Sequence, residues 1–198
     1  MAPMARPITI DRAKALKAAR GIFWRQGYTA TSMSQLLETM GIGSGSFYSA
    51  FDNKASLFAR VVDDYTQWSM TQFDKVRQDH RGLDAIRAFL HRTLIDISDS
   101  ARRKGCLLVN SVLELEDVEP YLYSHVYDAL GQLEETIRQC IDEAVDPKAL
   151  RPGIDKHDAV GLIMSQIHGL RVDSRLGLSH AEAQKRLNTL LNLLSISH

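Results

Sequence analysis

The chain has 198 residues, of which 44% are hydrophobic and 24% are charged, so it can bury a core in one or two globular domains. Its formal net charge is zero, which by itself argues against a nucleic-acid-binding protein. Two cysteines are too few for a disulfide framework. No apolar run reaches the roughly 18 residues of a membrane span, and the N-terminus lacks the apolar core of a signal peptide. We therefore expect a cytoplasmic protein without a membrane partner, a metal or another cofactor.

The charges are distributed unevenly along the chain. Residues 1–60 contain eight Lys or Arg against three Asp or Glu, whereas the remainder contains 16 against 21. A basic N-terminal segment followed by an acidic remainder is typical of a DNA-binding module attached to a separate body. The distribution therefore reverses the argument from net charge.

The N-terminal third predicts an arm and two helices. Residues 1–9 contain two prolines and are expected to form a disordered arm. Apolar residues at helical spacing predict a first helix over residues 11–26. Ser32 and Gln35 have the spacing of a capping box, which begins a second helix, and Gly41 ends that helix.

A second, very short helical pattern with Phe47, Tyr48 and Phe51 follows Gly41. Two short helices joined by a glycine-containing turn of about three to four residues form a helix-turn-helix, whose second helix can enter the DNA major groove. This pattern predicts a DNA-binding regulator.

The rest of the chain predicts six more helices. They cover residues 53–78 with Asp52 as the N-cap, 83–97, 106–116, 118–144, 155–176 and 179–194, with a polar, basic connection at 98–104. No segment shows the alternation of a strand, so we expect an all-α protein of about nine helices. The expected domains are a three-helix helix-turn-helix head at residues 1–51 and a larger helical body at 52–198.

Residues 27–58, GYTATSMSQLLETMGIGSGSFYSAFDNKASLF, resemble the N-terminal domain of the tetracycline-repressor (TetR) family. The matching positions are Phe23, Gly27, Tyr28, Thr31, Ser32, Gly41, Ile42, Gly45, Ser46, Phe47, Tyr48, Phe51, Asn53 and Lys54. The resemblance implies a dimeric transcriptional regulator. It says little about what the remaining two thirds of the chain bind.

Eight residues of the head are candidates for DNA contacts. Ser32 offers backbone N–H groups and a hydroxyl at a helix N-terminus to a phosphate, and Tyr48 and Lys54 resemble the family's phosphate clamps. The residues expected to face base edges are Ser34, Ser44, Gly45, Ser46 and Ser49. Because the recognition helix carries no Arg, Asn or Gln, readout is expected through serine hydroxyls, water, thymine methyls and DNA shape. Arg6 and Arg12 are candidates for minor-groove contacts.

The body is expected to hold an effector pocket for an unknown small molecule. The candidate pocket residues are Trp68, Phe73, Phe89, Asn110, Glu114, Tyr123, Tyr127 and His168. Asn110 and Glu114 lie four residues apart on a mostly apolar helix, and a buried amide or carboxylate needs a partner. That partner is either a ligand or a neighbouring helix, and both alternatives stay open.

Cys106 follows Arg102, Arg103, Lys104 and Gly105 and precedes an apolar helix. A helix N-terminus and nearby cations favour a thiolate. The segment GCLLVN is also similar to one found in some TetR-family repressors, a subset of which sense electrophiles or oxidants through this thiol. Cys106 is therefore either a redox switch or a small side chain that fills a tight helix junction.

The last two helices carry more apolar surface than one body needs, and the resemblance implies that they form a four-helix dimer interface. The expected interface residues are Gly161, Ile167, Leu187, Leu190, Leu191 and Leu194.

The function that fits these observations is a dimeric DNA-binding regulator, a repressor released from a palindromic operator by a small-molecule effector. One alternative is a repressor switched by oxidation or alkylation of Cys106. A second is a helical interaction module that does not bind DNA. The sequence shows no catalytic triad, metal cluster or cofactor fingerprint, so an enzyme is not expected.

Overall fold

The computed structural model describes residues 11–143 and 150–195. In these ranges the helices are α1 (Arg12–Gln26), α2 (Met33–Met40), α3 (Ser44–Phe51), α4 (Lys54–Arg77), α5 (Gly82–Leu90), the π-helical turn η1 (His91–Ile95), α6 (Asp99–Arg102), α7 (Leu107–Leu115), α8 (Pro120–Asp142), α9 (Lys156–Arg175) and α10 (His180–Leu194). The described residues contain no β-sheet, so the all-α prediction is confirmed. The arm predicted at residues 1–9, with Arg6, lies outside them.

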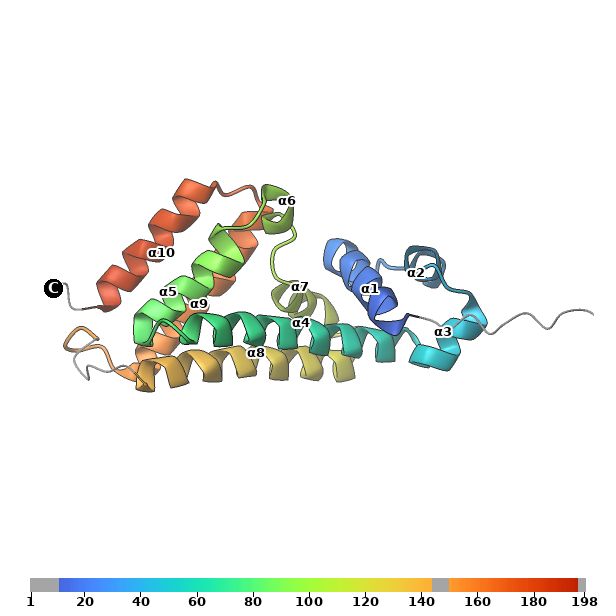
Figure 1. Ribbon diagram of the computed structural model, residues 1–198, viewed down its shortest axis with the longest axis horizontal. Coiled ribbons are helices and arrows are strands. Elements are labelled where there is room, and N and C mark those ends of the chain that lie inside the picture. Colours follow the sequence, from blue (N-terminus) through green and yellow to red (C-terminus); the bar gives the residue numbers. More distant parts are fainter. Residues whose placement is uncertain (1–10, 144–149, 196–198) are drawn as a thin grey trace, which may run out of the picture.

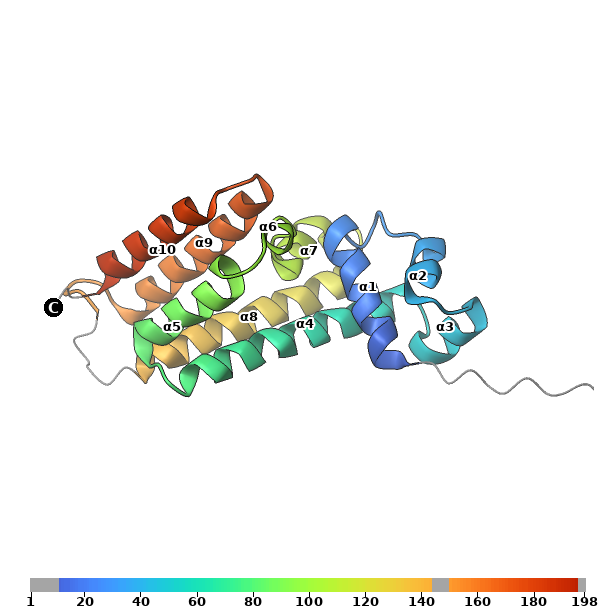
Figure 2. The same ribbon diagram turned by 45° about the horizontal axis from the view of Figure 1, so that its top comes forward.

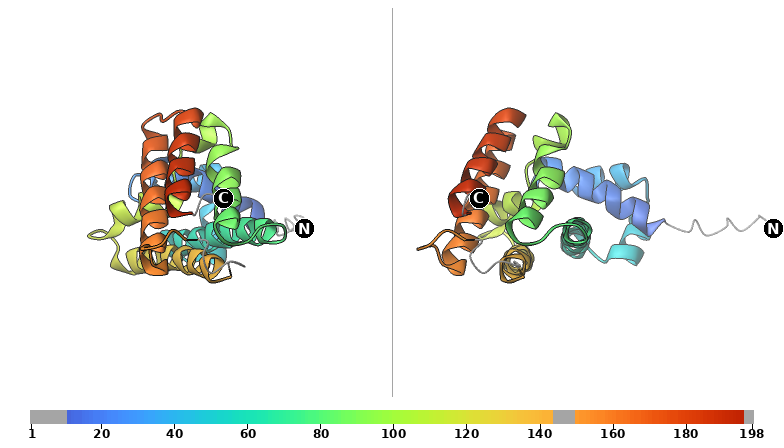
Figure 3. Two further views of the ribbon diagram at one scale, coloured as in Figure 1. Left: turned by 90° about the vertical axis from the view of Figure 1, so that its left-hand side faces the viewer. Right: turned by 60° about the vertical axis from the view of Figure 1, so that its left-hand side comes forward.

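The molecule is elongated, with the head at one end of a long helical pair (Figure 1). Helices α4 and α8 lie side by side along the long axis, and α1, α2 and α3 gather at the end where α4 begins (Figure 2). Helices α5, α9 and α10 form a second layer over the other half of that pair, as the view along the long axis and the oblique view show (Figure 3). Helix α7 lies between the two ends, against α1 and α8.

Helix starts follow the local capping chemistry. The Ser32 hydroxyl accepts the Gln35 N–H at 3.2 Å and the Gln35 side chain accepts the Ser32 N–H at 2.9 Å, so the predicted capping box is confirmed. Helix α4 is capped by Asn53, whose side chain accepts the Ser56 N–H at 2.8 Å. The expected cap, Asp52, instead ends α3 with φ 63° and ψ −60°, which lies outside the left-handed helical region.

All nine expected helices are present within the described residues, and a short α6 is added in the segment predicted as a connection. Ser98 caps α6 by accepting the Ala101 N–H at 3.3 Å. The buried Arg102 side chain donates to the Leu178 carbonyl and lies 3.4 Å from Asp99. The basic connection is therefore a packed turn, because one of its cations is used to join α6 to the α9–α10 loop.

Two hydrophobic clusters form the core. One joins α1, α2 and α3 to the first half of α4, to α7 and to the start of α8, and the other fills the space among the remaining helices. The head therefore shares its core with three helices of the body, α4, α7 and α8. The domain boundary at residue 51 stays a prediction. Because packed cores transmit strain, the shared core couples the position of α7 to that of the head.

Candidate DNA-binding surface and effector cavity

The helix-turn-helix is built from α2, a three-residue turn and α3. Gly41 ends α2 in the left-handed conformation, with φ 66° and ψ 34°, which glycine adopts at little cost. The Ile42 N–H then donates to the Leu37 carbonyl at 3.2 Å, which reverses the chain. Helix α3 buries Phe47 and Phe51 against α4 and the rest of the head. Its opposite face is free to enter a groove.

The predicted DNA-contact residues lie on the outer surface of this motif. The exposed residues are Ser32, Ser34, Ser44, Gly45, Tyr48 and Ser49. Tyr48 is 54% exposed, whereas Ser46 is half-buried. The capping box occupies the Ser32 N–H and one lone pair of its hydroxyl, so the groups left for a phosphate are the hydroxyl hydrogen and the first amides of α2.

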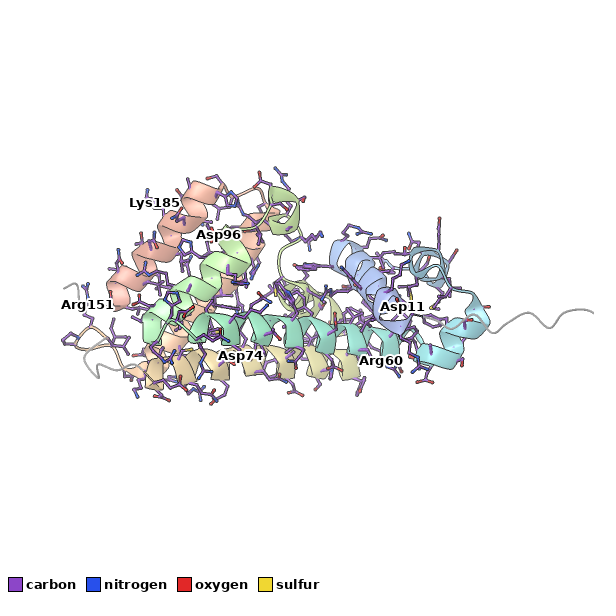
Figure 4. All side chains as sticks on the ribbon, in the orientation of Figure 1. Asp11, Arg60, Asp74, Asp96, Arg151 and Lys185 are labelled. Atoms are coloured by element: carbon purple, nitrogen blue, oxygen red, sulfur yellow. The ribbon has the colours of Figure 1, made fainter. Side chains whose placement is uncertain are left out.

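Two cations lie where α3 meets α4. The Lys54 Nζ lies 4.4 Å from the centre of the Tyr28 ring, and burial lowers the pKa of its ammonium group. The Arg60 guanidinium donates to the Ala50 carbonyl at 3.1 Å and lies on the first half of α4 (Figure 4). Arg60 thus ties the end of the recognition helix to α4. Arg60 is not among the DNA-contact residues that the sequence predicts.

A narrow cavity lies between α4, α5, α7, α8 and α9. It is lined by Tyr65, Thr66, Ser69, Met70, Phe89, Cys106, Leu108, Val109, Ala129, Leu130, Leu133, Ile167, His168 and Arg171. The centre of a water molecule can move within only about 20 Å³ of it, which is room for roughly one water. Most of the lining is apolar, and its polar groups are concentrated on α4 and α9.

The polar residues that line the cavity are Tyr65, Thr66, Ser69, Cys106, His168 and Arg171. The Tyr65 hydroxyl lies 3.6 Å from the Cys106 sulfur, and burial raises the pKa of that hydroxyl. The Arg171 guanidinium donates to the carbonyl and the hydroxyl of Thr93, at 2.9 and 3.3 Å. Burial lowers the pKa of the His168 imidazole, with an opposing effect of Glu134.

Two of the eight predicted pocket residues, Phe89 and His168, line the cavity. Phe73 stacks on Phe89 with ring centres 4.2 Å apart, inside the core. Trp68 is 39% exposed, and Tyr123 stacks on the exposed Tyr127 away from the lining. Phe73, Trp68, Tyr123 and Tyr127 therefore do not line this cavity, because aromatic residues at helical spacing also occupy core and surface positions.

Asn110 and Glu114 both bind protein groups outside the cavity. Their partners are therefore neighbouring segments of the chain, and neither residue faces a ligand in this cavity. The Asn110 amide donates to the Lys104 carbonyl at 2.9 Å. The Glu114 carboxylate accepts the backbone N–H groups of Tyr28 and Thr29, at 3.0 and 2.6 Å. Glu114 therefore joins α7 of the body to the α1–α2 loop of the head.

A second contact joins the head to the beginning of α7. The Trp24 indole N–H donates to the Gly105 carbonyl at 3.3 Å, and its ring meets Tyr65 edge-on with centres 5.0 Å apart. Arg20 of α1 adds an ion pair with Asp64 of α4 at 2.8 Å. We call these contacts, together with those of Glu114, the head–body joint. It borders the cavity, because Tyr65 belongs to both.

Cys106 is the N-cap of α7 and is buried. The three cations that precede it are directed elsewhere. Arg102 binds Leu178 and Asp99, Arg103 is exposed, and the Lys104 ammonium lies 5.5 Å from the centre of the Trp24 ring. Arg171 is the cation that shares the cavity with the thiol.

Most of the predicted dimer residues are buried within the chain itself. Ile167 lines the cavity, and Leu187, Leu191 and Leu194 are at most 1% exposed. Gly161 is exposed and Leu190 is half-buried. Ile167 and these three leucines pack in the body's own core, so they offer little surface to a partner, and the dimer interface stays a prediction. The apolar residues that α9 and α10 leave exposed are Leu162, Val172, Leu176 and Leu193.

Two protein-family profiles match the sequence. One, described as bacterial regulatory proteins of the tetR family, matches residues 15–61, and the other, a tetracyclin repressor-like C-terminal domain, matches residues 82–190. The chain belongs to the TetR family. The resemblance in residues 27–58 is thereby confirmed, and this TetR-family chain is a DNA-binding transcriptional regulator.

Individual TetR-family relatives agree with this result. The HTH-type transcriptional repressor ComR of Escherichia coli K12 is 24% identical over 190 residues, covering 95% of this chain and 90% of ComR. A cysteine mutant of CifR complexed with operator DNA shares the fold with a TM-score of 0.83 at 23% identity, covering 94% of this chain and 98% of that one. Reduced E. coli NemR has a TM-score of 0.79 at 18% identity, covering 93% and 97%.

In the part of the chain that the structure describes, no helix has both the length and the hydropathy that crossing a membrane requires.

Proposed function

We propose that this protein is a homodimeric repressor that binds a palindromic operator and releases it when a small molecule enters the cavity. The proposal rests on the observation that the cavity and the head–body joint have Tyr65 and α7 in common. Tyr65 lines the cavity and contacts Trp24 of the head, and α7 carries cavity residues at one end and Glu114 at the other.

The size of the cavity supports release upon binding. A molecule larger than a water or two does not fit into about 20 Å³, so its entry requires α7 or a neighbouring helix to shift. A ligand favours the shifted packing only by its difference in affinity for the two states. Because Glu114 binds two backbone amides of the head, a shift of α7 changes the position of the head.

The dimer proposal rests on the outer faces of α9 and α10. Leu162 and Val172 are exposed on α9, Leu176 is exposed directly after it, and Leu193 is exposed on α10. Adding a Cβ at Gly161 or Gly169 would meet no atom within 4 Å, so the surface beside both glycines is open to a close partner. A twofold dimer presents two heads, which can read half-sites separated by about 34–36 Å or a multiple.

Operator binding is expected to depend on Lys54 and Tyr48. Lys54→Ala should weaken binding similarly for all sequences and lower the slope of log affinity against log salt by about one unit. Tyr48→Phe should weaken binding without changing that slope. Lys75→Ala, an exposed lysine on the same helix, serves as the control.

Gel shifts at several salt concentrations measure this prediction. They also separate the proposal from a helical interaction module, which would show no salt-dependent shift. An unchanged affinity and slope in Lys54→Ala would remove Lys54 from the interface.

A second candidate for the inducer is an electrophile or oxidant that modifies Cys106. The observation in its favour is that the thiol lines the cavity, 3.6 Å from the Tyr65 hydroxyl. Alkylation by N-ethylmaleimide should abolish operator binding of the wild type and of Cys140→Ser, whose cysteine lies in the other core cluster. Cys106→Ser should bind DNA and resist the reagent. Release that persists in Cys106→Ser leaves a non-covalent ligand as the inducer.

A further inference from the structure

The cavity contains a buried cation without an acidic partner. Arg171 is 8% exposed, and its two hydrogen-bond acceptors, the Thr93 carbonyl and hydroxyl, are both uncharged. Among the described residues, no carboxylate oxygen lies within 4.0 Å of its guanidinium. Burying a charge without a counter-charge is strongly unfavourable, so the site favours the arrival of an anion.

A second polar group in the same cavity has no partner. The His168 Nε2 atom is buried and makes no hydrogen bond to the described residues, although such an atom is ordinarily satisfied. His168 and Arg171 lie three residues apart on α9 and both line the cavity. In the tautomer that carries a proton on Nε2, the imidazole has a hydrogen-bond donor that no described protein group accepts.

The rest of the lining favours an apolar ligand body. It is formed mainly by Met70, Phe89, Leu108, Val109, Ala129, Leu130, Leu133 and Ile167. None of the fourteen lining residues that the structure describes is Asp or Glu. Glu134 is the acidic group that acts on His168, and it pairs with Arg138 at 3.2 Å. The cavity thus has two nitrogen donors on α9, mostly apolar walls and no Asp or Glu among its described lining residues.

We propose that this cavity binds a small organic anion, a monocarboxylate with an apolar body, whose carboxylate meets Arg171 and His168. The planar guanidinium matches a carboxylate in two parallel hydrogen bonds, and charge-assisted bonds of this kind are about twice as strong as neutral ones. The inference rests on the proposed function, because it names the class of effector for the same cavity.

Calorimetric titration of the full-length protein tests the proposal with matched probes. Butyrate, hexanoate and benzoate are each compared with the corresponding amide, which has the same shape without the charge. At least one carboxylate should bind the wild type about tenfold or more tightly than its amide. The absence of binding by all three carboxylates, or equal binding of acid and amide, would overturn the proposal.

Variants of α9 identify the residues responsible. Arg171→Gln and His168→Phe should remove most of the preference for the acid, whereas Arg171→Lys should retain part of it. Arg175→Gln is the control, because Arg175 lies one turn further along α9 and is exposed. If Arg171→Gln does not fold, His168→Phe and Arg171→Lys still show whether these two residues produce the preference for the acid. Retention of the full preference in His168→Phe and in every folded Arg171 variant would contradict the site.

Gel shifts with the same probes separate this inference from the proposed function. Carboxylate binding through Arg171 that leaves the operator complex intact would support the site and contradict release by an effector. Operator release by another compound, together with no carboxylate binding, would refute only the ligand class.

Discussion

Gly27→Ala should lower the free energy of unfolding by about 3 kcal/mol or more, since backbone strain costs about 1–3 kcal/mol and a steric clash adds to it. Gly27 has φ 85° and ψ 175°, a region that is essentially restricted to glycine. A Cβ added there would lie 2.5 Å from Oε2 of Glu114. The substitution therefore strains the backbone and also displaces the carboxylate that holds Tyr28 and Thr29.

Chemical denaturation measures this prediction, with Gly41→Ala as the matched control. Gly41 also has a positive φ, of 66°, but a Cβ there would meet nothing within 4 Å, so only the left-handed backbone cost of about 1–2 kcal/mol applies. Glu114→Ala should make Gly27→Ala less damaging in the double variant, because the clash disappears. If both glycine variants lose the same stability, the joint is looser in solution than this geometry implies.

Leu193→Asp should yield a folded monomer with weak operator binding, whereas Leu191→Asp should not fold. The two residues lie two positions apart on α10, yet Leu193 is 54% exposed and Leu191 is 0% exposed. A buried, unpaired carboxylate costs several kcal/mol, which is a large part of a total stability of about 5–15 kcal/mol. At Leu193 the same charge is solvated in the monomer and becomes unfavourable only when a partner covers it.

Sedimentation and circular dichroism distinguish these outcomes. Asn192→Asp, which adds the same charge at an exposed neighbouring position, should remain a folded dimer. A wild-type dimer mass for Leu193→Asp would place the interface away from this part of α10.

The helix-turn-helix and the course of the helices could be predicted from the sequence, because their signals are local. The Ser32–Gln35 capping box and the Gly41 stop involve groups a few residues apart, so the residue types alone specify them. The position of Cys106 at the start of α7 follows from the same kind of signal.

The periodicity of α10 shows that one helix face is apolar, but it does not show whether the chain itself or a partner covers that face. Leu187, Leu191 and Leu194 are apolar at helical spacing, and they pack in the hydrophobic core of the body. Arg171 could have been noticed, since it lies on the buried face of α9 with Ile163, Ile167 and Leu170. A charged residue at such a position needs a partner.

The all-α class, the helix-turn-helix and its family could be predicted from the sequence, since these depend on hydrogen bonds and spacing within short segments. The head–body joint and the cavity could not, because they form only when distant segments pack together. Glu114 binds Tyr28 across 86 residues, and Arg171 binds Thr93 across 78. Such contacts depend on how four helices pack together, and no local pattern of residues specifies which buried polar group will meet which partner.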